Sequence, residues 1–451
     1  MIHNIIDTTN TIIAPATAAG GAIMVTRLSG CQAIEIADKM FRGRKKLVEA
    51  EGYTLHYGTI RNEQGNVVDD VVVALFRAPN SYTGDDIVEI TTHGSEQICT
   101  ELLRLAISYG ATMATPGEFT RRAFLAGKMD LSRAEAVADV IASDSEWSHN
   151  IASTQMRGGY SLKLAELRGE LMRLCSLLEL ELDFSEEDVE FAERSTLRTM
   201  LCQVEQQVSM LISSFSVGNA IKNGVNVAIV GEPNVGKSTL LNALVEDDRA
   251  MVSDVAGTTR DTIEATTTID GIRFRFVDTA GLRETDNQLE QMGITRTYRA
   301  IENAHVILHL TSAENPEFQN IELNEKQAYI KVINKIDKIT STINLSIHNT
   351  LTISAKEAQG IDKLRKKLRS TIDTSALNRN SVVVSNMRHY AALQSAHQAL
   401  ELALTALDNA LPSDLISEDI RQVLHHLGEI TGEVTSDDIL QTIFSKFCIG
   451  K

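Results

Sequence analysis

The chain has 451 residues, which is enough for two or three domains with sizeable cores. Hydrophobic residues make up 43% and charged residues 23%, as in ordinary globular proteins, and no run approaches the ~18 apolar residues of a membrane span. With 43 basic and 60 acidic residues the net charge is −17. This charge disfavours nucleic-acid binding over a broad surface without a partner, but it allows a local basic patch. The five cysteines are scattered without a C-x-x-C pair, so we expect neither a disulfide framework nor a zinc site, and a reducing cytoplasm as the setting.

The first 120 residues or so predict a β-rich region. Segments 67–76 and 86–94 are β-branched runs bounded by Gly and Asn, which is typical of strands. No proline lies between Pro116 and Pro233, and leucines recur at three- and four-residue intervals over 164–178. That spacing predicts long helices. Segments 386–411 and 416–428 also read as helices.

The middle of the chain, about 219–375, predicts a parallel sheet with crossover helices. Strand-like runs (VNVAIVG, FRFVDTAG, HVILHLT, YIKVINK) alternate there with polar, helix-compatible segments. The first run leads directly into GEPNVGKS at 231–238, which matches the phosphate-binding loop G-x-x-x-x-G-K-[ST]. The expected roles are phosphate neutralisation by Lys237 and Mg²⁺ ligation by the Ser238 hydroxyl.

Four further segments follow in the order that a GTP site requires. GTTRD (257–261) lies where a switch loop supplies a threonine to Mg²⁺, and DTAG (278–281) ends a strand, where Asp278 can hold magnesium through water. NKID (334–337) places the Asp337 carboxylate to accept both N1–H and N2–H₂ of guanine, a pair that adenine lacks. SAK (354–356) supplies a loop beside the base.

One residue departs from the Ras-like pattern. The position after the DTAG glycine, where Ras-like GTPases orient water with glutamine, is Leu282. Water positioning and positive charge must come from elsewhere, and the candidates are Arg260, Arg283, Glu284 and Glu290, or a bound monovalent cation.

Three features outside the GTP motifs are more specific to one protein family than the GTP motifs are. They are the C-terminal FCIGK (447–451), TPGEFTRRAFLAGKMDLSRAEAV (115–137), and GGAIMVTRLSG (20–30) paired with NSYTGDDIVEITTHG (80–94). With these the chain resembles, nearly end to end, the MnmE (TrmE) family of tRNA-modifying GTPases.

The resemblance implies an activity shared with a flavoprotein of the MnmG type. Together they add an aminomethyl or carboxymethylaminomethyl group to C5 of the wobble uridine of certain tRNAs. A tetrahydrofolate derivative (5-formyl or methylene form) supplies the one-carbon unit, and FAD is bound only by the partner. The implied assembly is a homodimer that joins the flavoprotein in a heterotetramer, without a membrane.

The resemblance also implies a multidomain α/β and all-α fold. Residues 1–120 would form an N-terminal α/β domain that binds tetrahydrofolate and dimerises. Residues 121–218 and 377–451 would form a discontinuous helical domain, and 219–376 an inserted Ras-like P-loop G domain.

Site residues follow from the same resemblance, position by position. Arg27, Glu89 and Lys128, with the C-terminal Lys451, match folate contacts. Cys448 matches a cysteine that matters in the family, and we expect it to face the folate pocket because no sequence-adjacent base activates it. A carboxylate such as Glu89 could pair with the N–H edge of a pterin, and Arg or Lys with the glutamyl tail.

In the G domain the resemblance implies hydrolysis activated by potassium and by G-domain dimerisation. Asn234, Ser253, Val255 and Thr258 match the K⁺ site, Ser238 and Thr259 ligate Mg²⁺, and Glu290 orients water, with Thr259, Arg260 and Asp261 as further catalytic positions. The full set of expected GTP contacts is Asn234, Val235, Gly236, Lys237, Ser238, Thr239, Ser253, Asp254, Val255, Ala256, Gly257, Thr258, Thr259, Asp278, Thr279, Ala280, Gly281, Asn334, Lys335, Asp337, Ser354, Ala355 and Lys356.

Two other functions would share the GTP motifs. A ribosome-assembly GTPase would carry an RNA-binding module such as a KH domain with its GXXG loop, and neither this module nor a matching positive charge is found in the sequence. A folate-dependent aminomethyltransferase with an accessory G domain would need no flavoprotein. The sequence has no flavin fingerprint, so flavin chemistry must come from a partner or be absent.

Overall fold

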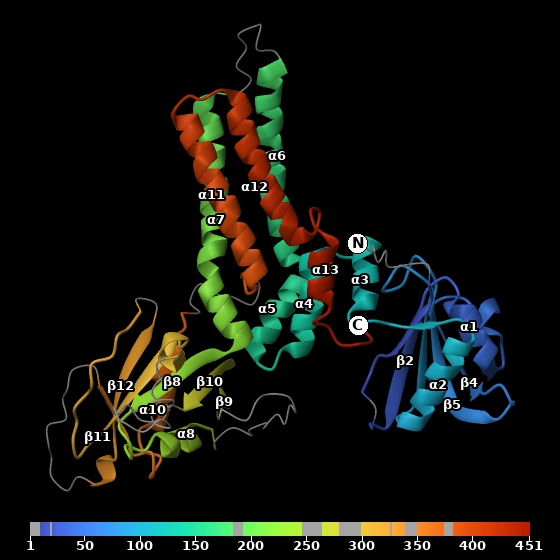
Figure 1. The fold of residues 1–451 in the computed structure, drawn as a ribbon, viewed down its shortest axis with the longest axis horizontal. Coiled ribbons are helices and arrows are strands. Elements are labelled where there is room, and N and C mark those ends of the chain that lie inside the picture. The colour runs from blue at the N-terminus through green and yellow to red at the C-terminus, as the bar shows by residue number, and fades with distance from the viewer. Residues whose placement is uncertain are drawn as a thin grey trace. The chain divides into compact units, whose positions relative to one another are not determined.

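The computed structural model describes residues 10–18, 20–183, 193–245, 264–278, 299–324, 327–338, 350–373 and 382–451. The chain divides into two compact units (Figure 1). One holds Met1–Ala138 with Gly428–Lys451, and the other holds Asp139–Leu427. Among the described residues, no helix is both long and apolar enough to cross a membrane.

The first unit is built on a mixed seven-stranded sheet in the order β3-β4-β5-β6-β2-β1-β7. Helices α1 (Ala33–Met40) and α2 (Glu96–Ser108) bury their apolar residues against this sheet, which forms the core of the unit. The strands are β1 (Ile12–Pro15), β2 (Ile23–Ser29), β3 (Phe41–Gly43), β4 (Thr54–Arg61), β5 (Val67–Phe76), β6 (Ile87–His93) and β7 (Thr112–Met113), with a 3₁₀ turn η1 (Leu47–Glu49).

The two ends of the chain meet within this unit. Helix α3 (Glu118–Leu125) lies against α13 (Asp437–Phe444), and the side chains of Leu131, Leu440 and Phe444 form a small core with Phe447. Helix α13 begins at a Ser436 cap, whose hydroxyl accepts a hydrogen bond from the Ile439 N–H. The C-terminal residues are thereby packed beside the N-terminal sheet.

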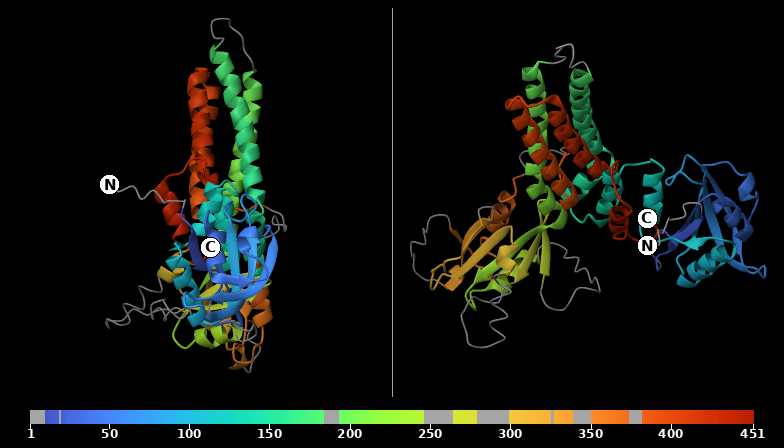
Figure 2. Two further views of the ribbon diagram at one scale, coloured as in Figure 1. Left: turned by 90° about the vertical axis from the view of Figure 1, so that its right-hand side faces the viewer. Right: turned by 45° about the horizontal axis from the view of Figure 1, so that its top comes forward.

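The second unit contains a helical bundle in which α6, α7, α11 and α12 run side by side (Figures 1 and 2). Leucines from 164 to 178 are buried along one face of α6, as their spacing predicts. The helices are α4 (Leu131–Ala142), α5 (Glu146–Met156), α6 (Gly159–Asp183), α7 (Arg194–Asn223), α11 (Met387–Asp408) and α12 (Ser413–Thr431), of which α4 and α12 continue into the first unit.

A six-stranded sheet in the order β13-β12-β11-β8-β10-β9 lies between α7 and α11 in the sequence. Its central strands are apolar along their whole length because both faces are covered, by α8 and α10 on one side. The elements are β8 (Val225–Gly231), α8 (Lys237–Val245), β9 (Glu264–Ile269), β10 (Ile272–Asp278), β11 (Val306–Ser312), β12 (Ala328–Asn334), η3 (Ile336–Lys338), β13 (Thr350–Thr352) and α10 (Ile361–Ser370).

The predicted fold class is confirmed. Helices α7 and α11 pack on each other although the α/β sheet separates them in the sequence, which makes the helical part discontinuous and the sheet domain inserted. All β8–β11–β12–β13 pairings are parallel, and the predicted strands at 67–76 and 86–94 are β5 and β6. The exact domain boundaries stay a prediction.

Candidate functional site

The predicted phosphate-binding loop connects β8 to α8, and two of its glycines leave no room for a side chain. Gly236 has a φ of 97°, and a Cβ there would lie 2.4 Å from Nδ2 of Asn334. A Cβ on Gly231 would lie 2.3 Å from the carbonyl oxygen of Leu310. The loop backbone therefore turns tightly ahead of the α8 N-terminus, a geometry that presents N–H groups to an anion.

Lys237, at the start of α8, folds back over this loop. Its Nζ donates to the carbonyl oxygens of Gly231 at 3.0 Å and Glu232 at 3.1 Å. Phosphates in the loop would meet this ammonium directly, and the exposed hydroxyl of Ser238 is next to it in the first turn of the helix. A hydroxyl and phosphate oxygens are the hard oxygen ligands that Mg²⁺ takes.

Asn334 joins the phosphate loop to the predicted base-binding loop. Its side chain is buried, its Nδ2 donates to the Val235 carbonyl at 2.9 Å, and its Oδ1 accepts from the Ala355 N–H at 2.9 Å. The neighbouring Lys335, at a φ of 65°, donates from Nζ to the Asn234 carbonyl at 2.5 Å. These bonds hold NKID, SAK and the phosphate loop as one constellation.

Asp337 carries the carboxylate predicted to read guanine. The Ser354 hydroxyl donates to its Oδ1 at 2.5 Å, and this hydrogen bond holds the pKa of the Asp337 carboxyl below its usual range. The carboxylate is exposed to solvent, so it is ionised at neutral pH and open to the N–H groups of a base. The hydrogen bond fixes one oxygen and therefore orients the group.

Asp278 is the last residue of β10, and the register of the sheet places it beside the phosphate loop. It pairs with Ile229 of the parallel strand β8, two residues before Gly231. Of the other predicted G-domain residues, Thr239 and Lys356 are exposed, and the rest lie outside the described part of the chain. They are Ser253, Asp254, Val255, Ala256, Gly257, Thr258, Thr259, Arg260, Asp261, Thr279, Ala280, Gly281, Arg283, Glu284 and Glu290.

In the first unit, the predicted folate residues Arg27 and Glu89 form an ion pair across β2 and β6. Arg27 donates from Nε to Glu89 Oε1 at 2.8 Å, and Nη2 lies 2.7 Å from the same oxygen. The guanidinium lies 5.8 Å from the Tyr82 ring and 5.6 Å from the Phe119 ring. A planar cation between two aromatic side chains can receive a planar, negatively charged ligand.

The C-terminal FCIGK lies against the same guanidinium. Arg27 Nη1 donates to the Gly450 carbonyl at 3.4 Å, the Phe119 N–H donates to the Lys451 carbonyl at 3.1 Å, and the Gly117 N–H to the Cys448 carbonyl at 3.4 Å. A Cβ on Gly450 would lie 2.1 Å from the Pro15 carbonyl oxygen, so only glycine fits there. The Cys448 side chain is exposed.

Lys128 contacts the loop at 79–85, which lies beside Arg27 through Tyr82. Its Nζ donates to the Pro79 carbonyl, and the same loop carries Tyr82. Sequence reasoning missed Tyr82 and Phe119 as site residues. Burial raises the pKa of the Tyr82 phenol, whose oxygen lies 2.9 Å from Thr120 Oγ1, so this group stays neutral. Both aromatics lie inside the quoted motifs 80–94 and 115–137, which was the available signal.

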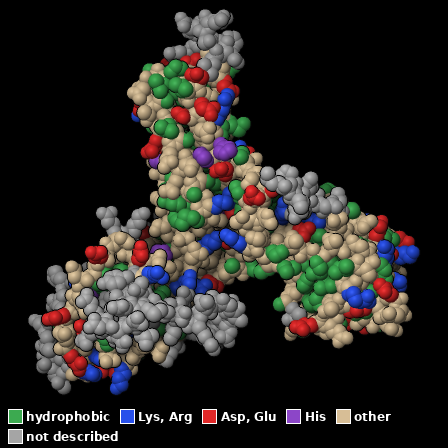
Figure 3. Space-filling model, viewed as in Figure 1, with side chains coloured by type: hydrophobic (Ala, Val, Ile, Leu, Met, Phe, Trp, Pro, Cys, Tyr) green, Lys and Arg blue, Asp and Glu red, His purple; other side chains and the backbone are tan. Residues whose placement is uncertain are grey.

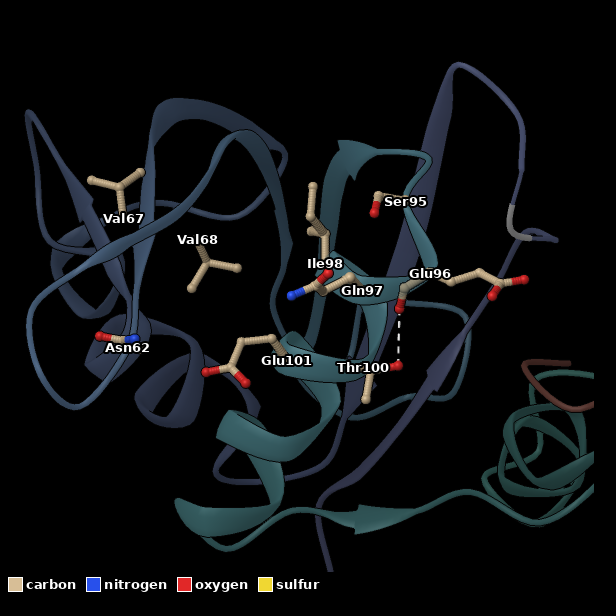
Figure 4. A pocket seen from close by; sticks show the side chains of 9 residues that line it. All are labelled: Asn62, Val67, Val68, Ser95, Glu96, Gln97, Ile98, Thr100 and Glu101. Carbon is tan, nitrogen blue, oxygen red and sulfur yellow. Dashed lines mark hydrogen bonds between the residues drawn. The ribbon is translucent and has the colours of Figure 1, made fainter.

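A separate hollow of about 810 Å³ opens on the first unit near the N-terminus of α2 (Figure 4). None of the predicted folate residues lines it. Its wall carries the carboxylates of Glu96 and Glu101, and Thr100 donates to the Glu96 carbonyl at 2.9 Å. Carboxylates make this hollow a poor site for an anionic ligand.

Protein-family comparison decides the classification. A profile described as "MnmE helical domain" matches residues 131–448, and one described as "GTP-binding protein TrmE N-terminus" matches residues 11–128. The chain belongs to the MnmE (TrmE) family. Relatives named "tRNA modification GTPase MnmE" from Bacteroides thetaiotaomicron and Cytophaga hutchinsonii are 48% and 47% identical, and each alignment covers 98% of this chain and 99% or 98% of the relative.

Among solved structures, Aquifex aeolicus Era matches with 28% identity and a TM-score of 0.27, covering 39% of this chain and 66% of that one. Membership of the MnmE family makes the chain a GTP-hydrolysing enzyme of tRNA modification. Lys237, Asn334 and Asp337 are the described residues that we expect to contact the nucleotide.

Proposed function

We propose that this GTPase acts with an MnmG-type flavoprotein. Together they add an aminomethyl or carboxymethylaminomethyl group to C5 of the wobble uridine of certain tRNAs, with a tetrahydrofolate derivative as one-carbon donor. The observation that supports this best is the first unit's own site. Arg27, Glu89, two aromatic rings and the C-terminal segment converge there, far from the GTP motifs in the sequence.

The fit of a folate is supported by the chemistry of these groups. A second oxygen of the Glu89 carboxylate is available for a pterin N–H edge, while Arg27 and Lys128 offer positive charge to a glutamyl tail. Cys448 is exposed at the end of the chain, and Lys451 follows it. The chain has no flavin fingerprint, so FAD would belong to the partner.

In the G domain, the expected Mg²⁺ ligands are Ser238 and Thr259, and the expected K⁺ ligands are Asn234, Ser253, Val255 and Thr258. Asn234 is exposed with a φ of 64°, so its side chain is open to a ligand beside the loop. A bound K⁺ supplies the positive charge that an arginine supplies in other GTPases. Glu290 would orient water, a role that glutamine has in Ras-like GTPases at the position occupied here by Leu282.

We also propose that the chain forms a homodimer through the first unit, in the cytoplasm. Hydrophobic side chains gather on the face of this unit visible in Figure 3. Strands β4 and β5 add the exposed side chains of Leu55, Tyr57 and Val72. Apolar exposure on neighbouring strands marks a surface that another protein covers.

Nucleoside analysis of tRNA from a deletion strain tests the central proposal. Loss of the modified wobble uridine is expected, and its return on expressing the wild-type chain; an unchanged profile would overturn the proposed reaction. The cation mechanism is tested separately by GTP turnover in KCl and in NaCl, where equal rates would exclude it. Glu290→Ala is expected to slow hydrolysis without weakening GTP binding.

A further inference from the structure

Helix α10 of the G domain is unusually basic. Its ten residues, IDKLRKKLRS, contain five basic side chains and one acidic one, a net charge of 5 − 1 = +4 in a chain whose net charge is −17. The positive charge of this helix contrasts with the net negative charge of the chain and creates a local basic surface.

The charges are sorted by position around the helix. Ile361, Leu364 and Leu368 are buried in the G-domain core, which fixes the inward face. Lys363, Lys366 and Lys367, spaced i, i+3 and i+4, are all exposed on the opposite face. Residues with this spacing are neighbours on a helix surface, about 5–6 Å apart at Cβ.

The basic residues of α10 divide into two groups by their contacts. Arg365 donates to the Leu244 carbonyl at 3.0 Å and Arg369 to the Ile372 carbonyl at 3.0 Å, so both have structural hydrogen bonds. Within the described chain, none of the three lysine ammonium groups takes part in an ion pair or hydrogen bond. Like charges at i, i+3 and i+4 destabilise a helix, so helix stability does not account for the three lysines.

The outward face lacks features that other partners would need. It carries the lysines, Asp362 and Ser370 but no exposed apolar residue, so it offers nothing to insert into a lipid surface. It has no aromatic side chain to stack on a base, which leaves the sugar–phosphate backbone as the complementary part of a nucleic acid.

We infer that Lys363, Lys366 and Lys367 form a docking surface for the phosphate backbone of an RNA, bound without sequence readout. The inference rests on the proposed tRNA function and names the part of the G domain that touches the substrate. This surface positions the tRNA and adds affinity, while recognition of the wobble uridine belongs to other residues. It also reconciles an acidic chain with an RNA substrate, since a local basic surface can bind phosphates despite the net negative charge.

The test uses the full-length chain and labelled tRNA from a strain lacking the modification, with affinity measured across a KCl series. The test variant reverses the three lysines (K363E, K366E, K367E). A matched control reverses three exposed basic residues of the first unit (R44E, K45E, K46E), which changes the net charge equally. GTP turnover without tRNA reports whether each variant is folded.

The α10 variant is expected to bind tRNA at least about 10-fold more weakly than the wild type at low salt. Its slope of log affinity against log salt should fall by about 2, because three phosphate contacts contribute about 0.7 each for single strands. The control variant should stay within about twofold of the wild type, and both should hydrolyse GTP normally.

Four results would overturn the inference. Equal losses in the two variants would mean that net charge alone matters. Unchanged tRNA affinity of the α10 variant would leave the proposed function standing without this surface. If the α10 variant lost binding to the flavoprotein instead of binding to tRNA, α10 would be assigned to a protein partner. A wild-type chain that binds no tRNA at any salt concentration, alone or with its flavoprotein, would overturn the inference and the proposed function together.

Discussion

Ser354 and Asp337 are joined by a hydrogen bond of 2.5 Å between the serine hydroxyl and one carboxylate oxygen. The bond connects the SAK loop to NKID, and it holds the pKa of the Asp337 carboxyl below its usual range. One oxygen is thereby fixed and the group stays ionised. If Asp337 accepts from guanine as we propose, Ser354 is the residue that orients the acceptor.

Changing these two residues should separate base choice from orientation. Asp337→Asn exchanges a carboxylate for an amide, so preference should move from guanine towards xanthine nucleotides. Ser354→Ala should keep the guanine preference but weaken GTP binding by about 3–10-fold, the effect of one hydrogen bond. Competition binding with GTP and XTP measures both.

The pH dependence gives a second readout for Ser354→Ala. With Asp337 as the base acceptor, GTP affinity should be lost as pH falls through the pKa of its carboxyl, because the protonated group no longer accepts two N–H groups. Removing the hydroxyl raises that pKa, so the loss should begin at a higher pH in the variant than in the wild type. Superimposable pH profiles would contradict the orienting role.

Gly236→Ala tests how tightly the phosphate loop and NKID are coupled. The new Cβ would lie 2.4 Å from Asn334 Nδ2, at a φ of 97° that L-residues rarely adopt. Strain and loss of the Asn334–Val235 hydrogen bond should together cost about 2 kcal/mol or more, which corresponds to about 30-fold weaker GTP binding.

A matched control is available at Gly110, which has a φ of 108° but nothing within 4 Å of the position of a Cβ. Gly110→Ala carries a similar backbone penalty without the clash, so it should lower stability and spare GTP affinity. Equal GTP affinity of the two variants would mean that Asn334 moves aside without consequence. Calorimetric titration with GDP or GTP provides the measurement.

Sequence patterns predicted the elements that rely on local periodicity or on motifs. The loop at 231–238 and the helices on either side of the inserted sheet were found because glycines, prolines and leucine spacing report local backbone geometry. Tyr82 and Phe119 were not predicted, because their position beside Arg27 depends on the pairing of β2 with β6 and on the packing of α3. Contacts over long sequence separations, such as Arg27 with Gly450, leave no periodic signal.

The Arg27–Glu89 ion pair should be required for folate binding. Arg27→Ala removes the charge between the two rings and the hydrogen bond to the Gly450 carbonyl, while Glu89→Gln keeps the shape and removes the negative charge. Each variant is expected to bind 5-formyltetrahydrofolate at least about 10-fold more weakly, since hydrogen bonds to charged groups are worth about 1.5–3 kcal/mol.

The exposed pair Arg104–Glu101 on α2 serves as the control for this experiment. Arg104→Ala should leave folate binding unchanged, because surface ion pairs contribute little and this one lies on a different element from Arg27. Fluorescence or calorimetric titration with the folate compares the three variants. Wild-type affinity in both Arg27→Ala and Glu89→Gln would remove these residues from the folate site.

His309 should make the second unit less stable in acid. The side chain is buried on β11, its Nδ1 lies 2.7 Å from the Tyr329 hydroxyl, and Lys331 is on the paired strand. Burial, with a smaller effect of Lys331, lowers the pKa of His309 to about 4. His309 is therefore protonated near pH 6.5 in the unfolded chain but only near pH 4 in the folded chain. The free energy of unfolding falls as pH drops through that window.

His309→Gln removes this proton uptake. The free energy of unfolding of the wild type, relative to the variant, should decrease as pH falls from about 6.5 to 4, with a slope of at most about 1.4 kcal/mol per pH unit. Urea unfolding followed by fluorescence suits the measurement, because the single tryptophan, Trp147, packs against the core of the inserted sheet. Replacing the exposed His425 by Gln should leave the pH profile of the wild type in place, and parallel curves for wild type and His309→Gln would show that His309 is protonated equally in both states.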